Sequence, residues 1–147
     1  MNRPIMKELS IEAYTDTSIL NSVAANLDGM NFKKVKTKYV KAGWDAISLH
    51  GYGPDPLDIL KPGVLKSSVN IEEKLQWTSL KDHHNMKPIL DMLDKLPCEF
   101  ERVRFMRLEA GKVIGKHTDK IDKDIGFDDG DIIRIHIPIR TNPQVVF

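Results

Sequence analysis

The sequence has very little cysteine and no long apolar run, and both shortages narrow the classes of protein it could be. Cys98 is the single cysteine among 147 residues, so an internal disulfide cannot form and a reducing compartment is favoured. The first residues, MNRPIMKELS, lack the apolar run of a signal peptide. No later stretch is long and apolar enough to cross a bilayer. We therefore expect a cytoplasmic protein with no membrane partner.

An excess of charge is also lacking. Lys and Arg total 22 against 21 Asp and Glu, for a net charge of +1, so bulk electrostatics do not favour a nucleic-acid partner. The apolar fraction of 41% is ordinary for a globular protein. The length allows one domain with a real core, and we expect a single domain over residues 1–147.

Two helices are predicted by apolar residues at helical spacing. The first runs to about Leu27, with Asp16 or Thr17 as its cap and a stop at Gly29. The second lies within HNMKPILDMLDKLP, residues 84–97, where Asn85 is a candidate cap and Pro88 is tolerated in a first turn.

Strands are predicted in the middle and the last third of the chain. Residues 32–53 contain two apolar runs closed by glycines, and FERVRFMRL shows an imperfect period of two. The segment 131–139, DIIRIHIPI, has the clearest strand pattern, with isoleucines alternating with Arg134, His136 and Pro138. Helices followed by antiparallel strands indicate an α+β fold in which helices buttress a β-sandwich or barrel.

The pair His117 and Asp119 is the first candidate site. Residues i and i+2 of an extended chain project from the same face, so an imidazole nitrogen and a carboxylate oxygen can point at one ion. These are two of the three ligands of a 2-His-1-carboxylate site for ferrous iron. Taken alone, His-x-Asp occurs by chance in many chains, and a surface histidine near an aspartate is the default interpretation.

Arg134 and His136 are the second candidate site. An arginine on a strand binds a carboxylate through a bidentate fork, and burying such a strand face without a partner would be costly. From periodicity alone, a strand face turned to water is at least as good an interpretation.

Taken together, RLEAGKVIGKHTD followed by IIRIHIPIRTNPQVVF resembles the aspartyl/asparaginyl β-hydroxylase family of iron(II)- and 2-oxoglutarate-dependent dioxygenases. The specific match covers roughly residues 100–147. Both motifs occur in the family's order, which is more specific than either alone. The resemblance implies a double-stranded β-helix core, a cupin-like jelly roll, with the N-terminal helices packed on it.

The resemblance also implies roles for individual residues. His117 and Asp119 would be ligands of Fe(II), and Arg134 and His136 would contact 2-oxoglutarate. Met106 and Leu108 would line the same cosubstrate pocket, and Trp44 would border the substrate side.

The chain departs from the family pattern after Phe147. No histidine follows His136, so the family's second iron histidine, the arginine that anchors 2-oxoglutarate and the second half of the jelly roll have no counterpart. His136 is a second choice for the third ligand. The sequence could be a fragment, or a second copy could complete the sheet as a homodimer, or the protein could be a shortened relative without catalysis. We favour a fragment.

The expected function is therefore hydroxylation of an Asp or Asn side chain in a peptide, of a free amino acid or of another small molecule. The alternative from another class is a non-catalytic, cupin-like binding or interaction module that keeps the Arg134/His136 anion pocket. A third alternative is a purely structural domain. We also expect Cys98 to be buried, and the acidic loop over residues 122–131 to act as a lid.

Overall fold

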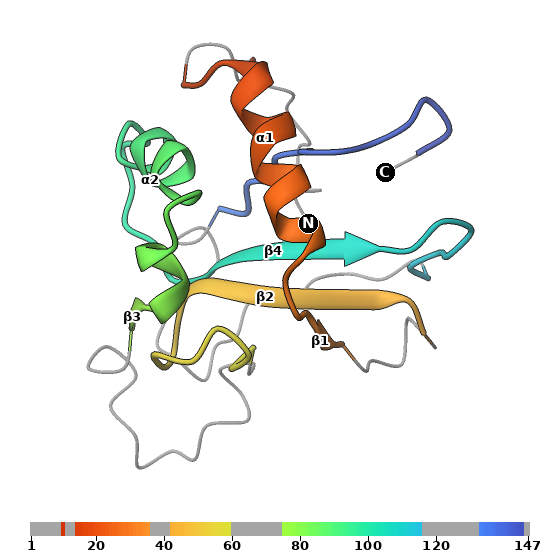
Figure 1. Ribbon diagram of the computed structural model, residues 1–147, viewed down its shortest axis with the longest axis horizontal. Helices are drawn as coiled ribbons and strands as arrows, with labels where there is room; N and C mark the ends of the chain where they lie inside the picture. The colour runs from red at the N-terminus through yellow and green to blue at the C-terminus, as the bar shows by residue number, and fades with distance from the viewer. Residues whose placement is uncertain (1–9, 11–13, 36–41, 60–74, 116–132, 146–147) are drawn as a thin grey trace, which may run out of the picture.

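The computed structural model describes residues 10, 14–35, 42–59, 75–115 and 133–145. Its elements follow the order α1 (Thr17–Asp28), β1 (Lys33–Lys34), β2 (Trp44–Gly51), β3 (Gln76–Trp77), a 3-10 helix (Ser79–Asp82), α2 (Lys87–Leu93) and β4 (Val103–Leu108). Both α-helices lie on the same side of the sheet (Figure 1). The predicted α+β class is confirmed: the described residues form two α-helices and an open, four-stranded antiparallel sheet.

Helix α1 forms where the apolar spacing predicts it. Asp16 is the N-cap, and its carboxylate accepts a hydrogen bond from the Ser18 amide at 2.8 Å. That hydrogen bond lowers the pKa of Asp16, as expected for a carboxylate that caps a helix. The helix buries its predicted apolar face, Leu20, Val23, Ala24 and Leu27.

Helix α2 is shorter than the predicted segment. Its N-cap is Met86 rather than Asn85, and Pro88 lies in the first turn, where its missing N–H costs nothing. Met86 is fully buried, so packing rather than side-chain capping fixes where this helix begins.

Strand β2 is the centre of the sheet. It pairs with β4 along one edge, from Trp44↔Leu108 to His50↔Val103, with a register shift between Ser48 and His50. Two short strands share its other edge: β1 pairs Lys33↔Ala46, and β3 pairs His50↔Trp77. Both lysines of β1 are exposed, as is common on a strand at the edge of a sheet.

The gap between β1 and β3 is filled by a loop and one buried hydroxyl. The Ser48 amide donates to the Pro56 carbonyl at 2.8 Å. Thr78 is 1% exposed; its hydroxyl donates to the Ser48 carbonyl at 2.7 Å and accepts from the Leu80 amide at 3.3 Å. One side chain thus joins β2 to the start of the 3-10 helix.

The core lies between the helices and one face of the sheet. Ile47, Leu49 and Phe105 supply the sheet side, and α1, α2 and Leu80 supply the rest. Gly43 precedes β2 with φ +81°, and a Cβ there would come within 2.6 Å of the Lys112 side chain, so glycine is needed at this turn.

Two expectations from the sequence are wrong. The segment 133–139 takes no part in the sheet that the structure describes. Ile137 and Ile139 pack against the core, whereas Ile133 and Ile135 are exposed. Pro138 has no N–H with which to form a hydrogen bond to a neighbouring strand. Cys98 is exposed because it follows the last turn after α2 rather than entering the core.

Candidate functional site: an arginine cluster at the start of strand β4

The two faces of β4 have different chemistry because its side chains alternate. Phe105 enters the core. Arg104, Met106 and Leu108 therefore project from the opposite face, away from the helices. Met106 is 45% exposed and Leu108 is 42% exposed. This outer face is apolar at one end and cationic at the other.

The outer face brings three of the predicted site residues together. Trp44 stands directly across from Leu108, and Ala46 stands across from Met106. The residues expected to line the cosubstrate pocket and the tryptophan expected at the substrate side therefore share one surface. That surface continues to Arg104, which stands across from Ser48.

Arg104 is the centre of a group of cationic side chains. Burial is the main cause that lowers its pKa to about 10, and the charges of Arg102 and Arg134 lower it further. Glu101 and Tyr52 act in the opposite direction. We call Arg102, Arg104 and Arg134 the arginine cluster. Its electrostatic coupling shows that Arg134, 30 residues further along the chain by number, returns to the start of β4.

His136 accompanies Arg134 at this cluster. Both residues are exposed as wholes, yet burial of the ionisable groups lowers the pKa of each, and the charge of Arg134 lowers the pKa of His136 further. A lowered pKa favours the neutral imidazole at neutral pH. The structure therefore places the two predicted anion-binding residues together, next to two arginines that the sequence did not identify as site residues.

Glu101 is the carboxylate beside the cluster, and other groups already bind it. Arg102 Nε lies 3.1 Å from Glu101 Oε1, and the Tyr52 hydroxyl donates to the same oxygen at 2.6 Å. His50 Nδ1 lies 3.1 Å from the Glu101 carbonyl oxygen. Burial lowers the pKa of His50, and its ring packs edge-on against Trp77 at 4.9 Å.

A second buried charge lies on the helix-facing side of the sheet. Asp45 pairs with Arg107 at 3.1 Å, and the Asp45 side chain is only 8% exposed against 42% for Arg107. The other carboxylate oxygen, Oδ1, is buried and has no hydrogen-bond partner among the described residues. Arg107 also lies over the Phe32 ring, 4.4 Å from its centroid.

The metal ligands expected from the sequence, His117 and Asp119, lie outside the described residues, as does the acidic loop expected to be a lid. Among the described residues, no group of three His, Cys, Asp or Glu side chains could hold a metal ion. His83 and His84 are exposed and stack on each other at 4.6 Å. No described helix is long and apolar enough to cross a membrane.

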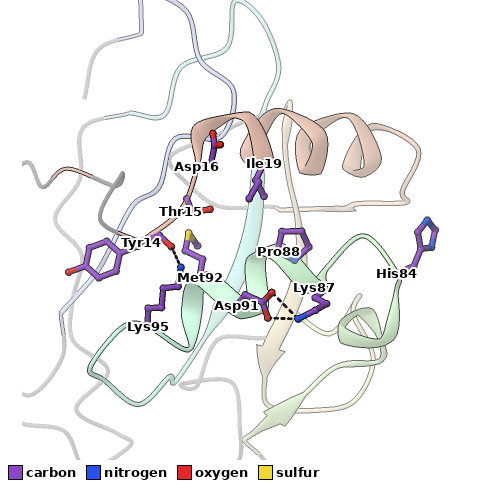
Figure 2. A pocket seen from close by; sticks show the side chains of 10 residues that line it. All are labelled: Tyr14, Thr15, Asp16, Ile19, His84, Lys87, Pro88, Asp91, Met92 and Lys95. Carbon is purple, nitrogen blue, oxygen red and sulfur yellow. Dashed lines mark hydrogen bonds and ion pairs between the residues drawn. The ribbon is translucent and has the colours of Figure 1, made fainter.

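A surface hollow of about 490 Å³ lies elsewhere, between the start of α1 and α2. Figure 2 shows that both of its lysines have partners among the lining residues: Lys87 binds Asp91 at 2.8 Å, and Lys95 donates to the Tyr14 carbonyl at 2.9 Å. None of the residues predicted from the sequence to form a site lines this hollow. Both of its lysines already have partners within the hollow, so the arginine cluster is the better candidate site.

Comparison with known proteins adds nothing to the geometry, since no family model, curated protein or solved structure matches this chain.

Sequence reasoning missed Arg102 and Arg104, although a signal for Arg104 was present. In RVRFMRL, Arg104, Met106 and Leu108 alternate with Val103 and Phe105. The alternation of the apolar residues is imperfect because the face that carries Met106 and Leu108 is cationic at the end occupied by Arg104. In the folded chain Arg104 is partly buried.

Proposed function

We propose that the protein binds a small dicarboxylic acid at the arginine cluster. The observation that carries this proposal is the state of Arg104, a partly buried guanidinium beside two further arginines. Burial disfavours the charged form of Arg104, and an anion that binds beside it would offset that cost. Guanidinium groups bind carboxylates through two parallel hydrogen bonds, so an organic acid fits this chemistry.

The acid that we propose is 2-oxoglutarate, because the sequence resembles the aspartyl/asparaginyl β-hydroxylase family. The residues present fit such a ligand: Arg134 can neutralise one carboxylate, and a neutral His136 can donate or accept a hydrogen bond beside it. Met106 and Leu108 extend the site with apolar surface against which the carbon chain of the acid could pack. Trp44 offers an aromatic face at the far end, where a substrate side chain could pack.

The proposed activity is hydroxylation of an Asp or Asn side chain, a free amino acid or another small molecule in the cytoplasm. Bound ferrous iron would supply the oxidising chemistry together with 2-oxoglutarate and dioxygen. His117 and Asp119 would hold it, and the imidazole and carboxylate groups of these residues suit ferrous iron. Strands added by the rest of a longer protein, or by a second copy, would complete the jelly-roll core implied by the resemblance.

A non-catalytic binding module is the second candidate. It is favoured because the described residues by themselves form the arginine cluster. Such a module would bind the acid without iron.

Anaerobic titration with Fe(II) and 2-oxoglutarate separates the two candidates. The enzyme predicts a charge-transfer absorbance band that is lost in His117→Ala and in Asp119→Ala. Binding of 2-oxoglutarate without metal and without the band supports the binding module. The absence of both would leave a structural domain and would contradict the proposal.

A further inference from the structure

Strand β4 is the outermost strand on its side of the described sheet, where β2 is its partner (Figure 1). The Glu109 amide donates to the Gly43 carbonyl at 2.8 Å, which identifies these two residues as a hydrogen-bonded pair. Such pairs alternate along an antiparallel ladder. The backbone N–H and C=O groups of Met106 and Leu108 therefore point away from β2, and no described residue forms a hydrogen bond with them.

The two edges of the sheet differ in how they are protected. The edge opposite β4 carries the short strands β1 and β3, of two residues each, and the lysines of β1 are exposed. Short strands and lysines both hinder pairing with a further strand. Strand β4 has six residues and contains no proline or glycine, and its Met106 and Leu108 side chains are exposed. Its edge is therefore the better template for an added strand.

The charges at the end of β4 determine which strand fits there. Arg107 pairs with Asp45 but is 42% exposed, and a guanidinium has five N–H donors, enough for a second carboxylate. Glu109 is exposed, and its carboxylate forms no hydrogen bond or ion pair within the described part of the chain. In an antiparallel pair of two β4 strands with a two-fold axis at Leu108, Arg107 of each copy stands directly across from Glu109 of the other.

Neighbouring registers lack this complementarity. A two-fold axis at Arg107 places that arginine across from its own copy, which is unfavourable. An axis at Met106 places Arg104 across from Leu108 and brings no opposite charges together. The axis at Leu108 combines the two ion pairs with an apolar contact between the two Leu108 side chains.

We propose that two copies of this chain pair through the ends of their β4 strands, antiparallel about a two-fold axis at Leu108. Backbone hydrogen bonds between the two Leu108 residues and the two Arg107–Glu109 ion pairs hold this interface, and they join the two sheets into one. The second copy adds its Leu108 to the apolar end of the outer face, next to Trp44. This inference goes beyond the proposed function and does not depend on binding of the acid.

The test combines sedimentation equilibrium of the full chain with hydrogen exchange of the Leu108 amide followed by NMR. The unaltered protein should form dimers, and the Leu108 amide should exchange more slowly as the protein concentration rises. Glu109→Arg turns two opposite-charge pairs into two like-charge pairs, so it should raise the dissociation constant by about 10-fold or more. Asp94→Arg is the matched control, a charge reversal at the exposed end of α2, and should leave the dissociation constant unchanged.

Cysteine cross-linking in a Cys98→Ser background determines the register. The Cα atoms of the two Leu108 residues should lie about 5.5 Å apart as a hydrogen-bonded pair, within the range of a disulfide. Leu108→Cys should therefore form a covalent dimer on mild oxidation. Met106→Cys should not, because position 106 stands across from Ala110 of the other copy.

Each contrary result overturns a defined part of the proposal. A chain that stays monomeric would overturn the dimer, and a monomer with a protected Leu108 amide would show that another part of the chain covers this edge instead. Dimers that Glu109→Arg does not weaken, or that cross-link through Met106→Cys in place of Leu108→Cys, would overturn the pairing of Arg107 with Glu109. None of these results depends on whether the protein binds 2-oxoglutarate.

Discussion

Replacing Arg104 with methionine should stabilise the ligand-free protein. The substitution removes a charge that burial and two neighbouring arginines disfavour, and methionine matches the adjacent Met106 on the same face. The fall in the pKa of Arg104 to about 10 corresponds to about 3 kcal/mol as an upper limit. Because the side chain is partly exposed, solvent screening reduces the expected gain to about 1 kcal/mol.

Urea unfolding measures this gain through the midpoint, with the slope unchanged if only the folded state is affected. Added salt should stabilise the unaltered protein more than Arg104→Met, because salt screens the repulsion among the arginines. Arg140→Met is the matched control and should change stability by less than about 0.5 kcal/mol, since its ion pair is exposed. A destabilisation of 1 kcal/mol or more in Arg104→Met would show that the folded protein favours this charge, and would refute the reasoning.

Three further predictions concern the fold around the site. Arg107→Met should lower the free energy of unfolding by about 2–3 kcal/mol, because it leaves the buried Asp45 carboxylate unpaired. Asp45→Asn should lower it by only about 1 kcal/mol, because Arg107 can reach water. Equal losses for the two variants in urea unfolding would contradict this reasoning. Thr78→Val should cost about 1–3 kcal/mol by removing two buried hydrogen bonds, and an unchanged midpoint would argue against that role. Burial lowers the pKa of His50 in the folded protein. As the pH drops below about 6.5, the imidazole of the unfolded chain is therefore protonated before that of the folded protein, and the free energy of unfolding should fall. His50→Gln should flatten that fall, and an equally steep fall would exclude His50 as its cause.

The helices were predictable because their information is local. Asp16 and the spacing of four apolar residues specified α1 almost to the residue. The start of α2 was misplaced because the burial of Met86, a tertiary effect, outweighed the capping propensity of Asn85. Element type was therefore readable from periodicity, while this boundary depended on packing.

The strand pattern was less informative than it looked. DIIRIHIPI has the strongest alternation in the sequence, yet the segment 133–139 forms no strand in the described sheet. Periodicity reports which side chains could share a face, but it cannot report whether a partner strand exists. The contact between Ile137, Ile139 and the core shows that the apolar side of the pattern was partly correct.

The site was predictable only in part for the same reason. The resemblance identified Arg134 and His136, and the structure brings them to the start of β4. Arg104 could not be recognised from the sequence as a site residue, because its burial beside Arg134 results from long-range packing. The iron ligands expected at His117 and Asp119 remain a prediction.

The most direct test of the account is an NMR titration of the metal-free protein with 2-oxoglutarate, observing the Nε–Hε signals of the arginines. The account predicts saturable shifts of the Arg104 and Arg134 signals, while those of Arg107 and Arg140 stay in place. Shifts that are absent, or equal at all four arginines, would contradict a dicarboxylate site at the arginine cluster.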